Sequence, residues 1–147
     1  MPRPSASSTQ PADSLEQALG AFAPRLPLAV ALNNRPFGKP DAGMDMIFNF
    51  AQLMAHLAKT RELEAGSIVG SGTVSNKQGG LFGSSIANGG VGYCCLAEVR
   101  MYETIEAGKP KTPFMRFGDS VRIEMLDGNG ASVFGAIEQR VERYVTT

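Results

Sequence analysis

The C-terminal part of the chain contains the pattern that most restricts how it can fold. Residues 121–125 alternate apolar and charged side chains, and residues 133–141 place apolar or small side chains on one side of a second segment. This alternation is the period of a strand with one face turned inward. Between the two segments, Asp127-Gly128-Asn129-Gly130 is typical of a hairpin turn. The pattern therefore predicts two antiparallel strands joined by a tight turn.

Two further elements are predicted upstream of this hairpin. Apolar residues alternate with small or polar ones over 28–32, which predicts a strand, and Asn33-Asn34 can adopt the positive φ of a turn. Residues 35–43, with two prolines and two glycines, are expected to form a loop. The apolar spacing then becomes helical, so we predict one clear helix near 47–59 with Asn49 as its N-cap.

The remaining central segments carry weaker patterns. Residues 67–69 are expected to form a short apolar strand. Residues 76–92 contain six glycines and are expected to form a long loop, either a lid over a site or a disordered segment. The mixture of β-branched, apolar and charged residues over 93–105 favours one or two further strands.

Length and composition indicate one folded domain. The 147 residues include 43% hydrophobic and 19% charged residues, which fits a globular chain with a core. We predict that this domain spans residues 25–147. Residues 1–24 are predicted to be loose or weakly helical, with one short helix over 14–22, because the beginning of this segment is rich in Pro, Ser, Thr and Ala.

Charge and hydropathy exclude several classes of partner. Fourteen basic residues balance fourteen acidic ones, so no net field favours nucleic acid or an anionic membrane surface. The apolar runs fall well short of the roughly 20 residues that a membrane helix needs, and no secretory signal is recognisable, so we expect a cytoplasmic location. Cys94 and Cys95 are adjacent, which excludes a disulfide framework and the spacing of a structural zinc site. We expect them to be small buried thiols.

The segment from Gly70 to Ser75 carries the residues best suited to chemistry. Ser71, Gly72 and Thr73 place small side chains and hydroxyls at a strand end, where backbone N–H groups can approach an anionic ligand closely. A tight turn that simply needs glycine explains the same residues as well. The segment is not a nucleotide-binding loop, because it has neither the lysine of a P-loop nor the GxGxxG spacing.

Three blocks within residues 26–143 stand out by their order and spacing. They read DMIFNFAQLMAHLAKTRELEAGSIVGSGTVSN, CLAEVRMYETIEAG and FGDSVRIEMLDGNGASVFGAIEQRV. Together they resemble the C-terminal part of the catalytic domain of the fumarylacetoacetate hydrolase family. The resemblance implies an α+β fold, with a curved mixed β-sheet of roll type and the helix near 47–59.

The resemblance also implies a chemistry. Members of the family use a divalent cation, usually Mg²⁺ (or Mn²⁺ or Ca²⁺), to bind the oxygens of 1,3-dicarbonyl or 2-oxo acid compounds, which they hydrolyse, hydrate or decarboxylate. By resemblance, Thr73 contacts the substrate, with Ser71 and Gly72 beside it. Glu98 lies where hydrolase members place a carboxylate that orients the catalytic water. The alternative for Glu98 is an outward-facing, solvated glutamate of a strand.

The other titratable residues in these blocks have structural explanations. His56 is the only histidine, and we expect it on the polar side of its helix without a catalytic role. Arg100, Glu103 and Arg122 are expected to form salt bridges as strand residues rather than to bind substrate.

The metal ligands of the family are not found in this chain. In the family they are a Glu-x-Glu pair and a later Asp followed by an Arg, upstream of the segment that this chain resembles. Before Asp41 the acidic residues here are Asp13 and Glu16, and Asp41 and Asp45 lack the alternating oxygen donors of a calcium site. We therefore expect the chain to represent about the second half of such an enzyme, with metal ligands supplied elsewhere.

Three functions are compatible with these expectations. The first is metal-dependent hydrolysis, hydration or decarboxylation of a small oxo acid, with this chain forming the C-terminal half of the site. The second is a non-catalytic half-domain that forms a homodimer or pairs with a companion N-terminal half, because exposed core strands favour pairing. The third is a small-anion binding module that needs no metal.

Overall fold

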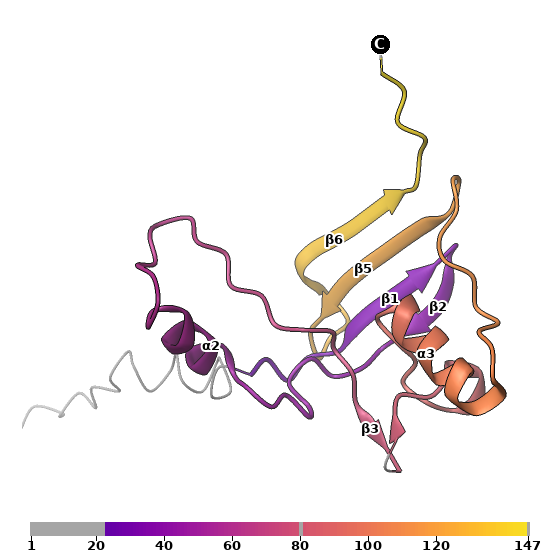
Figure 1. The fold of residues 1–147 in the computed structure, drawn as a ribbon, viewed down its shortest axis with the longest axis horizontal. Coiled ribbons are helices and arrows are strands. Elements are labelled where there is room, and N and C mark those ends of the chain that lie inside the picture. The colour runs from indigo at the N-terminus through magenta and orange to yellow at the C-terminus, as the bar shows by residue number, and fades with distance from the viewer. Residues whose placement is uncertain (1–22, 80, 147) are drawn as a thin grey trace, which may run out of the picture.

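A four-stranded antiparallel sheet lies at the centre of the computed structural model, which describes residues 23–79 and 81–146 (Figure 1). The sheet has the order β2-β1-β5-β6, and β3 and β4 form a separate two-stranded hairpin. The strands are β1 (Leu28–Leu32), β2 (Arg35–Gly38), β3 (Lys77–Gln78), β4 (Leu81–Phe82), β5 (Ser120–Leu126) and β6 (Ser132–Arg140). The helices are α2 (Phe50–Leu57), the 3₁₀ helix η1 (Ile86–Asn88) and α3 (Leu96–Ala107). The predicted α+β class is confirmed. The predicted mixed sheet is wrong for the described residues, because every pair of neighbouring strands in it is antiparallel, and the roll type stays a prediction.

The predicted C-terminal hairpin is confirmed. β5 and β6 pair with Ile123 opposite Ile137. The turn between them is held by Asp127, whose Oδ1 accepts hydrogen bonds from the backbone N–H groups of Asn129 and Ala131, both at 2.8 Å. An aspartate that bonds its own following backbone is a common way to fix such a turn. Because β6 has only one neighbouring strand in the sheet, it is an edge strand.

The first strand and its turn are also confirmed, but the loop predicted after them is partly wrong. Asn33 and Asn34 adopt φ values of 50° and 60°, and β1 pairs with β2 across this turn. The first half of the predicted loop over 35–43 is therefore the edge strand β2. An edge position explains how Pro36 fits there, since a proline has no N–H to donate to a neighbouring strand.

The helix predicted near 47–59 is present and shorter. α2 spans Phe50–Leu57, and Asn49 is its N-cap, as predicted. The Asn49 side chain accepts a hydrogen bond from the backbone N–H of Gln52, and the Gln52 side chain accepts one from the backbone N–H of Asn49, each at 2.9 Å. This reciprocal capping box satisfies two backbone donors at the helix start.

The prediction of strands over 93–105 is wrong, because this segment forms α3. The helix begins after Cys95, which has an extended backbone, and ends at Gly108, whose φ of 77° lies in the left-handed region. Between them, Leu, Ala, Glu, Arg and Met have high helix propensity and outweigh the few β-branched residues. Glu98 therefore lies in the first turn of a helix and not in a strand. The described chain has two α-helices where one was expected.

Two other local predictions differ from the structure. Residues 67–69 have no strand partner and are irregular. Residues 76–92 are not one continuous loop, because they contain β3, β4 and η1. The short helix predicted over 14–22 lies outside the described residues. No helix in the described part of the chain is long and apolar enough to cross a membrane.

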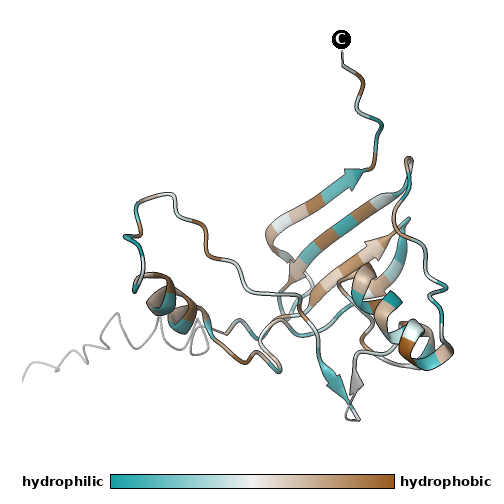
Figure 2. Cartoon of the chain, viewed as in Figure 1, coloured by the Kyte–Doolittle hydropathy of each residue, from teal (hydrophilic) through white to brown (hydrophobic). Residues whose placement is uncertain are grey.

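The central sheet has one apolar and one charged face. Figure 2 shows the resulting alternation along β5. On the charged face the guanidinium of Arg122 pairs with Glu124 at 3.0 Å and with Glu138 at 2.6 Å, so the salt-bridging role predicted for Arg122 is confirmed. The register places these large residues on the opposite face: Leu28, Val30, Leu32, Val121, Ile123, Met125 and Ile137.

The described chain covers the apolar face unevenly. Val30 is its one buried side chain, at 7% exposure, whereas Ile137 is 54% exposed. Among the described elements, no Cα atom of α2 or α3 lies within 8 Å of a Cα atom of the sheet. The apolar face is therefore only partly covered within residues 23–79 and 81–146, since its residues on β1 and β5 are buried or half-buried and Ile137 on β6 is exposed.

Candidate functional site

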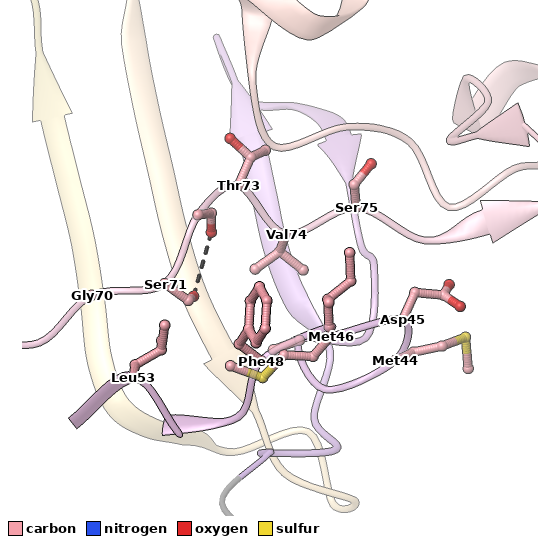
Figure 3. A pocket seen from close by; sticks show the side chains of 13 residues that line it. Met44, Asp45, Met46, Phe48, Leu53, Gly70, Ser71, Thr73, Val74 and Ser75 are labelled. Carbon is pink, nitrogen blue, oxygen red and sulfur yellow. Dashed lines mark hydrogen bonds between the residues drawn. The ribbon is translucent and has the colours of Figure 1, made fainter. Parts of the chain in front are cut away.

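The segment that the sequence selects as a candidate site, residues 70–75, forms one wall of a pocket of about 310 Å³ (Figure 3). Residues 44–48 form the opposite wall, and Leu53 of α2 contributes one side chain. Both walls are irregular backbone. The two segments are separated in the sequence by α2, so the pocket exists only because the chain returns on itself after this helix.

The side chains of the pocket divide by polarity. In Figure 3, Val74 points toward Phe48, whereas the hydroxyls of Thr73 and Ser75 point to the other side of their segment. Ser71 Oγ donates only a long hydrogen bond, 3.4 Å, to the backbone carbonyl of Gly72. The side of the segment that faces Phe48 therefore carries the apolar Val74, and the hydroxyls of Thr73 and Ser75 lie on its other side.

Asn76 holds the two walls together. Its side chain is buried, with 3% of the residue exposed. Its Oδ1 accepts a hydrogen bond from the backbone N–H of Asp41 at 2.8 Å, and its Nδ2 donates to the backbone carbonyls of Asp41 at 3.0 Å and Met44 at 3.1 Å. A buried amide with three partners fixes the backbone of residues 41–44 against the hydroxyl-bearing segment. The sequence pattern did not single out Asn76, because its partners lie more than 30 residues away.

Two aspartates support the same wall through the backbone. Asp41 Oδ1 accepts hydrogen bonds from the backbone N–H groups of Gly43 and Met44, at 2.9 and 2.8 Å. Asp45 has a φ of 60°, and its Oδ2 accepts a hydrogen bond from the backbone N–H of Lys77 at 2.8 Å. Asp45 is the carboxylate that lines the pocket. Asp41 therefore fixes the turn within its own wall, whereas Asp45 ties that wall to residue 77.

Glu98 lies behind the hydroxyl-bearing wall and not in the pocket lining. Its Oε1 accepts a hydrogen bond from Ser75 Oγ at 2.9 Å, and its Oε2 is buried without a partner in the described chain. Burial, together with the nearby Glu98 and Cys95, raises the pKa of Cys94 to about 11, so Cys94 is a neutral thiol at physiological pH. The two cysteines are half-buried and not disulfide-bonded.

The remaining titratable candidates take other positions. His56 is exposed on α2, as predicted. Arg100 and Glu103 lie on α3, so the prediction that they bridge as strand residues is wrong. Arg100 donates to the backbone carbonyl of Thr112 and lies 4.3 Å from the ring centroid of Phe114. Hydrogen bonds from the hydroxyl and backbone N–H of Thr112 lower the pKa of Glu103.

The comparison with known families covers this site and nearly all of the chain. The family model described as Fumarylacetoacetate (FAA) hydrolase C-terminal matches residues 5–142. The chain belongs to this family. The resemblance carried by the three sequence blocks is thereby confirmed, and a hydrolase-like or lyase-like function follows at the level of the family. A search of the curated proteins found no match to this chain.

Members of the fumarylacetoacetate hydrolase family are commonly metal-dependent, but the described residues of this member do not fit a metal ion. Over residues 23–79 and 81–146, no three His, Cys, Asp or Glu side chains converge on one point. Ca²⁺ and Mg²⁺ take six or more oxygen ligands, and oxygens of Asp41 and Asp45 are already engaged by backbone N–H groups. No metal centre is assigned within these residues.

Thr73 and Glu98, the two residues with roles implied by the fumarylacetoacetate hydrolase family, are connected through Ser75. Glu98 bonds to Ser75, which is two residues from Thr73 in the same segment. Thr73 is exposed in the pocket lining, whereas Glu98 contacts that lining from behind. The structure thus joins α3 to the candidate substrate-binding segment through one side-chain hydrogen bond.

Proposed function

We propose that this chain provides the substrate-binding wall of an enzyme that hydrolyses, hydrates or decarboxylates 1,3-dicarbonyl or 2-oxo acid compounds. The observation that carries the proposal is the pocket in which Ser71, Gly72 and Thr73 lie across from residues 44–48, in a member of the fumarylacetoacetate hydrolase family. Of hydrolysis, hydration and decarboxylation, we propose hydrolysis as the reaction.

The groups of the pocket suit such a ligand. The hydroxyl of Ser71 makes only a long hydrogen bond at present and can turn to donate to a ligand carboxylate. The backbone N–H of Gly72 is a further donor in the same exposed segment, and the hydroxyl of Thr73, which points away from Phe48, would have to turn toward the ligand to donate to it. The apolar side chains of Phe48 and Val74 offer contact to the carbon chain of the ligand.

Glu98 has a separate role in this proposal. One carboxylate oxygen holds Ser75, while the buried second oxygen has no partner in the described chain. A buried carboxylate oxygen without a hydrogen-bond partner destabilises the fold, so a hydrogen bond from a donor to this oxygen is favourable. We propose that this oxygen accepts a hydrogen bond from the attacking water, which would have to enter between α3 and residues 70–75 because Glu98 does not line the pocket.

Mg²⁺ is the cation that we propose for the complete site, as a Lewis acid that polarises the oxo group of the substrate. Its ligands would come from outside residues 23–79 and 81–146, for example from a companion N-terminal half or a second copy. The described residues bind and orient the substrate and a water in this scheme. The reducing cytoplasm, which suits two free cysteines, is the proposed location.

Calorimetric titration with an acylpyruvate tests substrate binding, once in chelator and once in Mg²⁺. Thr73→Val keeps the shape of the side chain but removes its hydroxyl. We expect it to weaken binding about 10-fold to 100-fold, as for a hydrogen bond to a charged group. Thr60→Val, at an exposed threonine just after α2, is the matched control and should bind as the original chain does. Equal affinity of the two variants would contradict the proposed contact, and binding in chelator would favour the metal-free module.

Turnover of the same acylpyruvate in Mg²⁺ tests Glu98. We expect Glu98→Gln to lower kcat at least about 100-fold with little change in KM, because the amide cannot act as a base. Glu62→Gln, at an exposed glutamate outside the pocket, is the control. A rise in KM with unchanged kcat would show that Glu98 only positions Ser75. No turnover by the original chain would restrict catalysis to a larger assembly.

The second candidate function is a half-domain that associates through its sheet. The specific observation in its favour is the partly uncovered apolar face, on which Ile137 is 54% exposed. Sheet faces of this kind are normally buried against another layer. We propose that a second copy of the chain covers this face and forms a homodimer, with a companion chain as the alternative partner.

Light scattering coupled to size-exclusion chromatography tests this association. The original chain should elute with the mass of a dimer, and Ile137→Lys should shift it toward the mass of a monomer, because burying an unpaired ammonium is unfavourable. Val145→Lys is the control, since Val145 is also exposed, at 73%, but lies outside the sheet. A monomeric original chain would rule out the homodimer.

A further inference from the structure

A second cavity, of about 450 Å³, lies beside α3 and shares no lining residue with the candidate site. Five parts of the chain build it: Pro36 and Phe37 of β2, residues 83–88 around η1, Tyr93, one face of α3, and Thr112. Its volume falls within the range of small-molecule sites in proteins, about 300–1,000 Å³.

One continuous face of α3 lines this cavity. Val99, Tyr102, Glu103 and Glu106 follow the spacing i, i+3, i+4 and i+7, which places their side chains on the same side of the helix. Val99 is buried, and Tyr102 and Glu103 are half-buried, whereas Glu106 is exposed at the rim. The helix thus presents an aromatic ring and two carboxylates to one space.

Three aromatic rings from three separate segments meet at the cavity. The ring centroid of Tyr93 lies 6.2 Å from that of Tyr102 and 6.4 Å from that of Phe37, with interplanar angles of 39° and 47°. The rings are therefore tilted and not stacked face to face. At these separations the rings pack against each other, and a cation that lies beside a pair in the cavity can be within about 6 Å of both centroids, the distance over which a ring face attracts positive charge.

The charge of the lining is entirely negative. Glu103 and Glu106 line the cavity, and none of its lining residues is a lysine or arginine. Three hydrogen bonds from Lys111 and Thr112 keep Glu103 ionised. The nearby Arg100 is directed elsewhere, since it lies over the ring of Phe114. Carboxylates are also close enough to Tyr93 to add to the effect of burial, which is the main cause of its raised pKa.

We propose that this cavity binds a small organic cation of the quaternary ammonium class. Aromatic faces and carboxylates attract the same positive charge, and a methylated ammonium can leave water more readily than a small inorganic ion. The carboxylate of Glu106 pairs with the cation at the rim, while Tyr93 and Tyr102 contact its methyl groups. The site is independent of the oxo acid pocket and of its proposed reaction.

Tyrosine fluorescence gives a direct test, because the chain has no tryptophan and two of its three tyrosines line the cavity. The probe is choline, compared at constant ionic strength with 3,3-dimethylbutan-1-ol, its uncharged isostere. We expect a saturable change in emission with choline and none with the alcohol. Saturation by the alcohol at the same concentration would overturn the proposal, because apolar contact alone would then explain binding. No saturable change with choline would overturn it as well.

Variants locate the binding event. Glu106→Gln removes the rim charge from an exposed position, where the fold is not at risk, and should weaken choline binding about two- to fivefold. Tyr102→Leu should weaken it by a similar factor. Glu142→Gln is the control, because Glu142 is exposed and does not line the cavity. Unchanged affinity in Glu106→Gln, or an equal loss in Glu142→Gln, would refute the assignment.

Discussion

Replacement of Asn76 by alanine is expected to destabilise the fold and to separate the two walls of the candidate site. The change removes three hydrogen bonds, at 2.8, 3.0 and 3.1 Å, that join Asn76 to the backbone of Asp41 and Met44. A hydrogen bond contributes about 1 kcal/mol net, so the free energy of unfolding should fall by about 3 kcal/mol. Since the side chain is only 3% exposed, water reaches the released backbone groups poorly, which argues against a much smaller loss.

Urea denaturation followed by far-ultraviolet circular dichroism measures this loss. The midpoint should fall in Asn76→Ala while the slope with denaturant stays the same. Asn76→Asp keeps the acceptor but turns a carboxylate oxygen toward two backbone carbonyls. We expect it to be at least as destabilising at pH 7, and to recover part of its stability near pH 4, where the protonated acid can donate one hydrogen bond again.

Asn129→Ala is the matched control, since Asn129 is exposed in the β5–β6 turn and Asp127 bonds to its backbone rather than to its side chain. Its effect should stay within about 0.5 kcal/mol. A loss of less than about 1 kcal/mol in Asn76→Ala would refute the assigned role, because three part-buried hydrogen bonds should together contribute more than that. An Asn76→Asp variant as stable as the original chain at pH 7 would refute the assigned amide orientation.

Two further changes test other contacts of the fold. A β-carbon at Gly38 would lie 2.7 Å from the backbone carbonyl carbon of Tyr93, so Gly38→Ala should lower the free energy of unfolding by about 1–3 kcal/mol. Gly128→Ala is the control and should have little effect, because a β-carbon there meets no atom within 4 Å. Equal denaturation midpoints of the two variants in urea would contradict this prediction. A hydrogen bond from the backbone N–H of Arg116 is the main cause that lowers the pKa of Asp119. Its stabilisation is therefore complete well above the unfolded value of about 3.9 and is lost as the pH falls through the lower folded value, so Asp119→Asn should reduce the difference in stability between pH 7 and pH 3. An unchanged difference between these two pH values would contradict the contact.

The elements predicted correctly depend on neighbouring residues. The alternation over 121–125, the Asp127–Gly130 turn and the Asn49 cap each involve positions at most a few residues apart, and all three are present. The helix α3 was missed although local signals for it exist. The interior of α3 is rich in residues of high helix propensity, which outweigh its few β-branched residues. Gly108 is a recognisable signal for the end of the helix.

The candidate site was only partly predictable. The sequence pointed to residues 71–73, and the structure places them in a pocket lining. It did not indicate that residues 44–48 form the opposite wall, or that Glu98 reaches the site only through Ser75. Short polar residues such as Asn76 occur in most loops, so the residue type alone does not reveal a buried tie.

The order of residues along the chain was enough to indicate the family, the α+β class, the C-terminal hairpin and the segment that carries the candidate site. These features follow from residue order and from periodicities of two and three to four residues, which local backbone geometry imposes. Only the tertiary structure decided that Asn76 ties two walls across 35 residues, that Glu98 bonds to Ser75 across 23, and that α3 shares a cavity with Tyr93 and Phe37. Such contacts depend on how distant segments pack, and no local preference of the chain specifies which distant group will lie opposite.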